Sequence, residues 1–68
     1  MQREWLKNLR TENGLTVTEA ARKLDLSQPY YSLIEAGERQ KRLELSLAAK
    51  IADLYHITID KIRQLDEE

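Results

Sequence analysis

The sequence has no cysteine and a single histidine, His56, and these two scarcities exclude several kinds of site. Without cysteine the chain can form neither a disulfide nor a thiolate metal site, and one histidine does not build a zinc site. The chain also lacks a Ser/His/Asp or Cys/His catalytic set and a glycine-rich loop that would cradle phosphate. We therefore expect a protein that is not an enzyme, has no cofactor or bound metal, and acts on no small-molecule substrate.

Long apolar runs are equally scarce. No stretch approaches the roughly 20 apolar residues that cross a bilayer, and the charged N-terminus lacks the apolar core of a signal peptide. We therefore expect a cytoplasmic protein with no membrane contact. A chain of 68 residues is also short, so we expect one domain over residues 1–68, with no room for a second, ligand-sensing domain. Its stability then depends on helix packing, with or without a partner subunit.

Only two glycines and one proline interrupt a sequence that is rich in helix-forming residues and has almost no alternating apolar and polar stretches. This pattern predicts an all-α fold. We expect five helices, over about residues 2–12, 16–24, 27–35, 44–55 and 58–65, followed by a frayed tail, Asp66-Glu67-Glu68.

Several residues mark helix ends. Thr16 and Glu19 have the spacing of a capping box, in which each side chain satisfies a backbone N–H of the other residue. Ser27 is a good N-cap for the third helix, and Pro29 falls in the first turn, where its missing N–H costs nothing. Gly14 supplies the left-handed turn that closes the first helix.

The second and third helices are joined only by Asp25-Leu26-Ser27. So short a joint makes the two helices cross steeply and pack closely, as in a helix-turn-helix. Ala21 provides the small residue that close packing needs, and the space between the helices is filled by Leu24, Leu26, Tyr31 and Ile34. Asp25 stands where the turn needs a positive φ, with an expected strain of about 1 kcal/mol relative to glycine.

The net charge of −1 is weak for a nucleic-acid-binding protein, which is usually strongly basic. The charges are unevenly distributed, however. Residues 22–43 carry five basic and three acidic side chains, whereas residues 44–68 carry three basic and six acidic ones. This asymmetry suits a protein with one face on DNA and another turned away.

Four segments of the chain carry a resemblance to a known family. They are Leu6-Lys7-x-Leu9-Arg10, Gly14-Leu15-Thr16, Ser27-Gln28-Pro29-Tyr30-Tyr31-Ser32-x-Ile34-Glu35-x-Gly37 and Lys50-Ile51-Ala52-Asp53-Leu54-Tyr55-x-Ile57. In this order and spacing they resemble the phage-repressor/Cro-type helix-turn-helix family, or xenobiotic-response-element family, over roughly residues 3–65. The resemblance implies a five-helix, lambda-repressor-like domain. Members of this family are largely transcription regulators, and they commonly bind operators as dimers.

The resemblance also implies roles for residues around the third helix, whose N-terminal side chains reach base edges in the major groove. The residues expected to contact bases are Gln28, Pro29, Tyr30, Ser32 and Leu33. Among them, Gln28 can pair with adenine N6 and N7, and Tyr30 reaches a phosphate or stacks along the groove wall. The residues expected to contact phosphate are Thr16, Thr18, Ser27, Arg39, Lys41 and Arg42. Arg10 and Glu35 occupy the positions of an ion pair that ties the first helix to the third.

Some residues depart from the family pattern or have a plain structural interpretation. Val17 stands where a glutamine often binds the DNA backbone, so we expect no such bond from this position. Leu33 replaces a residue that is often polar. Tyr31 is expected in the core, and His56 is expected to be a turn residue. Trp5 has two possible roles, a contact with a partner or a partial cover over the fifth helix.

The sequence thus predicts a sequence-specific, double-stranded DNA-binding regulator of transcription, a repressor of phage or mobile-element type that binds its operator as a homodimer. The alternative is a protein-interaction module on the same fold, such as an antitoxin or antirepressor, which the low net charge and Leu33 favour. A regulatory protein partner is compatible with both. The apolar residues left for a dimer interface or for the core are Tyr55, Ile57, Ile59, Ile62 and Leu65.

Overall fold

A computed structural model describes residues 2–67, and within this range all regular structure is helical. The helices are α1 (Glu4–Glu12), α2 (Val17–Lys23), α3 (Gln28–Glu35), α4 (Leu45–Tyr55) and α5 (Ile59–Glu67). The expected all-α fold with five helices is therefore confirmed. None of the helices in residues 2–67 has the length and apolar character needed to cross a membrane.

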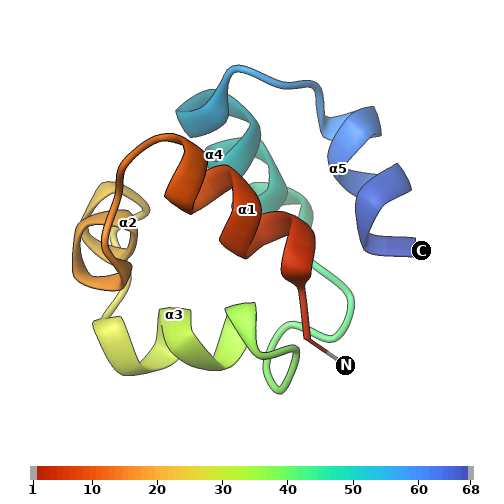
Figure 1. The fold of residues 1–68 in the computed structure, drawn as a ribbon. Helices are drawn as coiled ribbons and strands as arrows, with labels where there is room; N and C mark the ends of the chain where they lie inside the picture. The colour runs from red at the N-terminus through yellow and green to blue at the C-terminus, as the bar shows by residue number, and fades with distance from the viewer. Residues whose placement is uncertain (1, 68) are drawn as a thin grey trace.

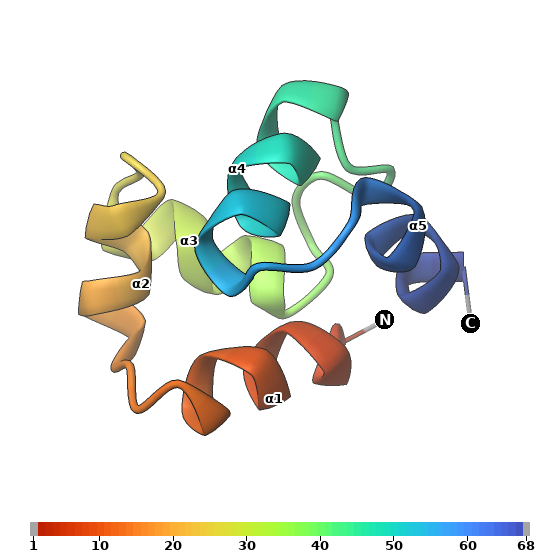
Figure 2. The same cartoon turned by 90° about the horizontal axis from the view of Figure 1, so that it is seen from above.

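The helices are arranged so that α3 lies at the edge of the molecule. Figures 1 and 2 show α2 and α5 at opposite ends, with α1 and α4 between them. α3 packs mainly on α2 and also on α1, while α4 packs on α5. One face of α3 therefore packs against the rest of the protein, and the opposite face lies on the outer edge of the molecule seen in Figure 1.

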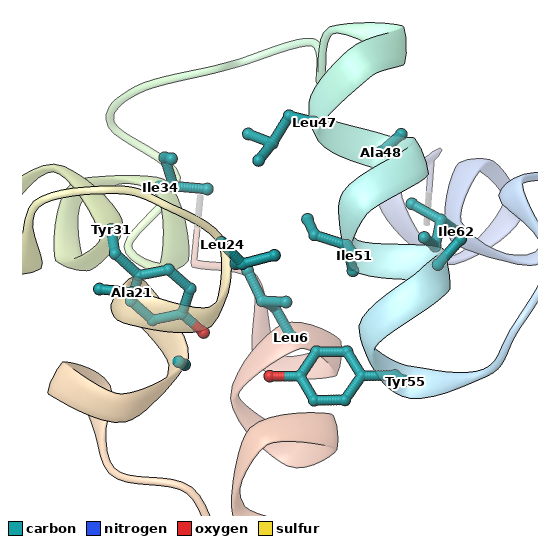
Figure 3. Close-up of a cluster of buried hydrophobic side chains, with 12 residues drawn as sticks. Leu6, Ala21, Leu24, Tyr31, Ile34, Leu47, Ala48, Ile51, Tyr55 and Ile62 are labelled. Atoms are coloured by element: carbon teal, nitrogen blue, oxygen red, sulfur yellow. The ribbon is translucent and has the colours of Figure 1, made fainter.

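One hydrophobic core joins all five helices (Figure 3). Its largest fully buried side chains are Leu6, Leu24, Tyr31, Ile34, Ile51 and Ile62. Burial of each such side chain stabilises the fold by roughly 1.5–3 kcal/mol relative to exposure. Tyr31 and Ile34 come from α3, as expected, so the core holds this helix in place by its inner face.

The joint between α2 and α3 has the expected geometry. Asp25 has a φ of +60°, and Leu26 donates its backbone N–H to Ala21 O over 2.8 Å. The side chain of Ala21 is 1% exposed, which allows the two helices to approach closely. The turn residue His56, with a φ of +57°, ends α4 in the same left-handed conformation, and this prediction is also confirmed.

The predicted caps are present. Glu19 donates its backbone N–H to Thr16 Oγ1 over 3.1 Å, and Thr16 donates its own to Glu19 Oε1 over 2.9 Å, so the capping box is complete. This hydrogen bond from the Thr16 backbone lowers the pKa of Glu19. At the start of α3, Ser27 Oγ accepts from the backbone N–H of Tyr30 over 3.3 Å.

The start of α1 differs from the prediction. This helix begins at Glu4, two residues later than expected, because the Arg3 backbone leaves the helical conformation, with a φ of −90° and a ψ of 80°. In that conformation Arg3 donates its N–H to Glu35 O over 2.8 Å, at the end of α3. A contact distant in the sequence thus overrides the local preference for helix.

The expected fraying of the tail is wrong for Asp66 and Glu67, because α5 continues through Glu67, while Glu68 lies outside the described residues. Asp66 is half-buried and accepts a hydrogen bond from Trp5 Nε1 over 3.2 Å. Trp5 therefore contacts α5, which agrees with one of the two roles expected for it, while its half-buried side chain leaves the partner contact as an untested prediction.

Candidate nucleic-acid interface

The outer face of α3 carries most of the residues that the sequence analysis expected to contact bases. Gln28 and Pro29 are exposed, Ser32 is half-buried, and Leu33 is 36% exposed. Gln28 Nε2 donates to Ser32 Oγ over 3.1 Å, one helical turn away. The amide of Gln28 also has a second N–H and a carbonyl oxygen, so this bond leaves its capacity to pair with a base edge intact.

Tyr30 is placed differently from these residues. It is half-buried, packs against the core, and accepts a hydrogen bond from Gln40 Nε2 to its hydroxyl over 2.8 Å. The hydroxyl hydrogen remains a donor, because the bond from Gln40 uses only the oxygen. Tyr30 therefore lies toward the C-terminal loop that follows α3, away from the other expected base contacts.

The turn between α2 and α3 forms a shallow, open hollow at the N-terminal end of α3. Thr18 and Arg22 line it from α2, Asp25 lines it from the turn, and Ser27 and Gln28 line it from the start of α3. The exposed carboxylate of Asp25 opposes an anion here, and the guanidinium of Arg22 offsets it. Two hydroxyls and a guanidinium beside one another are donors that suit a phosphate oxygen. Arg22 was not among the expected phosphate contacts, although its position four residues after Thr18 puts it on the same face of the helix.

Thr16 does not line this hollow. Its backbone N–H and its hydroxyl oxygen are both used in the capping box with Glu19. Only the hydroxyl hydrogen of Thr16 is left as a donor, beside an exposed carboxylate that repels phosphate. Of the expected phosphate contacts, Thr16 is thus the least favourably placed.

A charged loop, residues 38–42, follows the C-terminal end of α3. Arg39, Lys41 and Arg42 in this loop are all exposed. The loop bends sharply, with Gln40 at a φ of +54°, and Glu38 donates its backbone N–H to Leu33 O over 2.9 Å. Figure 1 shows the loop leaving the C-terminal end of α3, and the three cations in its sequence therefore lie at the end of the helix opposite the turn with α2.

Arg10 and Glu35 form an ion pair between α1 and the end of α3. Arg10 Nε lies 3.0 Å from Glu35 Oε2, Arg10 Nη2 lies 3.1 Å from Oε1, and the two side chains are 11% and 12% exposed. The hydrogen bond with Glu35 raises the pKa of Arg10. A paired, largely buried guanidinium of this kind fixes the orientation of two helices through its planar, two-bond geometry.

The C-terminal residues divide between core and surface. Tyr55 and Ile62 are 7% and 1% exposed, so they complete the core and do not remain for a dimer interface. Ile57, Ile59 and Leu65 are half-buried. Leu45, at the start of α4, is 69% exposed. Within residues 2–67, no group of three acidic, histidine or cysteine side chains is arranged to hold a metal ion.

Comparison with known proteins agrees with this geometry. A family model described as helix-turn-helix matches residues 6–62. The chain is also 39% identical over 46 residues to a Bacillus subtilis (strain 168) protein named uncharacterized HTH-type transcriptional regulator YqaF. This match covers 68% of the chain and 60% of that relative's length. No solved structure matched the chain. The family match, which spans α1 to α5, shows that the chain belongs to the Cro-type helix-turn-helix family.

Proposed function

We propose that this chain is a sequence-specific DNA-binding regulator of transcription that inserts α3 into the major groove. The observation that carries the proposal is the position of the outer face of α3 between two sets of basic and hydroxyl side chains whose chemistry suits phosphate. The hollow with Arg22 lies at one end of the helix, and the charged loop, residues 38–42, lies at the other. A recognition helix in the major groove needs backbone contacts on both sides to fix its register.

Different residues of α3 then have different roles. Gln28 reads a base edge, with adenine as the favoured partner. One turn further along, the Ser32 hydroxyl accepts or donates a hydrogen bond to a second base. Leu33 packs against a thymine methyl group. Pro29 packs at the N-terminal end of the same face. Tyr30 contacts a phosphate and not a base edge, because Gln40 of the charged loop holds its hydroxyl beside that loop.

The weak net charge is compatible with this function because the cations are concentrated near α3. Arg22 and Lys23 at the end of α2 and the three cations of the charged loop are exposed. The acidic excess lies in residues 44–68, which form α4 and α5. DNA affinity depends on how many phosphates are neutralised locally, so a basic edge around α3 is sufficient.

We further propose that residues 1–68 act as one domain and bind as a homodimer, as a repressor of phage or mobile-element type. Two copies related by two-fold symmetry would place their α3 helices about 34–36 Å apart on inverted half-sites. The 69% exposed Leu45 supports self-association. It lies in a groove that it shares with the apolar Ala48 and Ile59 and with charged side chains, among them Lys41 and Arg42 of the charged loop. Occupation of an operator by itself blocks other proteins from that DNA, which favours repression.

The experiment that tests the proposal is selection of bound duplexes from a random library, followed by titration at two salt concentrations. We expect an enriched sequence that binds at least ~10³-fold more tightly than random DNA, with an affinity that falls steeply as salt rises. A library that yields no enriched sequence would contradict sequence-specific binding. It would favour the second candidate, a protein-interaction module, for which the exposed Leu33 and Leu45 are the supporting observations.

A further inference from the structure

Arg3 is the one charged residue that is buried within residues 2–67, with 5% of its surface exposed. Its guanidinium donates from Nε to Asp66 Oδ1 over 2.7 Å and from Nη1 to Ile34 O over 2.7 Å. It also donates to two backbone carbonyls of the charged loop, from Nη1 to Arg39 O over 3.1 Å and from Nη2 to Gln40 O. One side chain thus links the end of α3, the charged loop and α5.

This set of bonds is what allows a guanidinium to be buried. A buried charge is costly unless an opposite charge and hydrogen-bond acceptors compensate for it, and Arg3 has both. Asp66 supplies the opposite charge, and Trp5 Nε1 donates to the same carboxylate over 3.2 Å and so helps to hold it. Removal of Arg3 would leave three backbone carbonyls without this donor.

The first residues of the charged loop are held to α3 by their own backbone, since Glu38 and Arg39 donate their N–H groups to Leu33 O over 2.9 and 3.2 Å. Beyond Arg39, the loop has few contacts that fix its conformation. The cationic side chains Arg39, Lys41 and Arg42 are exposed and contribute nothing to the core. On its other side the loop is attached through Gln40, which donates to Tyr30 and accepts from the backbone N–H of Glu44 over 3.1 Å. The backbone of Gln40 is left-handed, with a φ of +54°, a conformation that a non-glycine residue adopts only when it is held there.

We propose that Arg3 is a positioning residue for the phosphate-contacting loop, and that Asp66 on α5 sets the strength of this attachment. Arg3 does not touch the DNA itself. It holds the carbonyls of Arg39 and Gln40 so that the loop cations remain beside the end of α3. The inference deepens the proposed function and rests on it for its effect on DNA binding, whereas its effect on the loop is independent of DNA.

The test uses two variants of the full chain, each with a matched control. Arg3→Gln is compared with Arg63→Gln, which removes the same charge from an exposed position on α5. Asp66→Asn is compared with Glu67→Gln, which removes the same charge from the neighbouring exposed residue. If Arg3→Gln does not fold, Asp66→Asn provides the test. Two quantities are measured: amide hydrogen exchange in residues 38–42 relative to α2, and the dependence of DNA affinity on salt concentration.

We expect Arg3→Gln and Asp66→Asn to speed exchange in the charged loop by about tenfold or more while α2 changes much less, because loops open locally when their few attachments are removed. On the selected duplex, we expect affinity to fall on the order of tenfold, with a salt slope smaller by about 0.9 for each phosphate that the loop no longer neutralises. The two control variants should leave both quantities close to those of the parent protein.

Equal acceleration of exchange in the loop and in α2 would show a purely structural role for Arg3 and would overturn the inference. An unchanged salt slope in a folded variant whose parent binds DNA would overturn it as well. If the parent protein binds no duplex, the proposed function fails. Hydrogen exchange in the free protein then decides alone whether Arg3 positions the loop.

Discussion

The hydroxyl groups of Tyr31 and Tyr55 point toward each other in the core (Figure 3), yet they are bonded differently. Tyr31 Oη donates to Glu35 Oε2 over 2.7 Å. Tyr55 Oη is buried and has no hydrogen-bond partner among residues 2–67. We therefore expect the two hydroxyls to affect stability differently, because a buried hydroxyl without a well-aligned partner costs free energy and a bonded one does not.

We predict that Tyr55→Phe leaves the free energy of unfolding unchanged or raises it by up to about 1 kcal/mol, since it removes an unsatisfied polar group. Tyr31→Phe should lower it by about 1 kcal/mol, because the bond to Glu35 is removed while Arg10 still pairs with that carboxylate. Urea unfolding followed by circular dichroism measures both. A larger loss of stability for Tyr55→Phe than for Tyr31→Phe would show that the Tyr55 hydroxyl has a partner.

The same tyrosines predict the response to alkaline pH. Burial, and for Tyr31 also the hydrogen bond to Glu35, raises the pKa of both residues. Below about pH 10 both are neutral in the folded and unfolded chains, so their contribution to stability is fully present. Above that pH the unfolded chain loses protons that the folded chain retains, and stability falls by up to about 1.4 kcal/mol per pH unit for each tyrosine.

This fall can be measured as the shift of the urea midpoint between about pH 9 and about pH 11. Tyr55→Phe removes one of the two contributions, so the midpoint of this variant should shift less than that of the parent protein. An equal shift in the two proteins would mean that Tyr55 ionises in the folded state as readily as in the unfolded chain.

The ion pair between α1 and α3 gives a third prediction. Glu35→Gln leaves the guanidinium of Arg10 mostly buried without its opposite charge, and we expect a loss of about 2–3 kcal/mol in stability. This is below the loss for a fully buried pair, because the Arg10 and Glu35 side chains keep 11% and 12% exposure. Replacement of both residues by leucine should restore only part of the stability, because it also leaves the buried Tyr31 hydroxyl without its acceptor. A loss below about 0.5 kcal/mol for Glu35→Gln would place this pair with ordinary surface ion pairs.

The elements that the sequence predicted well depend on local interactions. The Thr16–Glu19 capping box, the Ser27 cap and the positive φ of Asp25 each involve residues within a few positions of one another. Their physical causes are therefore readable from spacing and residue type alone. The presence and order of the five helices followed from the same signals.

The features that the sequence did not predict depend on contacts between distant segments. Arg3 lies 63 positions from Asp66, so no local pattern indicated that the guanidinium would be buried against the tail. For the same reason the tail was expected to fray. On α4, periodicity alone could not decide that Leu47 faces the core while Leu45 is exposed, because that depends on how α4 is rotated against its neighbours.

The turn between α2 and α3 gives a fourth prediction. Asp25 holds a φ of +60°. Asp25→Gly removes the strain of that conformation but makes the unfolded chain more flexible, so we expect a net change between 0 and about +1 kcal/mol in stability. Asp25→Ala, which keeps the Cβ and removes the polar side chain, should destabilise by about 1 kcal/mol. Thermal unfolding of the two variants measures the difference, and an alanine variant as stable as the glycine variant would show that the turn is not strained.

The position of the exposed Gln28 at the start of α3 is central to the proposed function. The most direct test compares Gln28→Ala and Arg42→Ala, with Arg63→Ala on α5 as the control for charge, in titrations against the selected duplex and random DNA. We predict that Gln28→Ala weakens binding to the selected duplex by about 1–3 kcal/mol and leaves random DNA nearly unaffected, whereas Arg42→Ala weakens binding to both alike. An equal loss of affinity on both duplexes for Gln28→Ala, or no loss on either, would contradict base reading by α3.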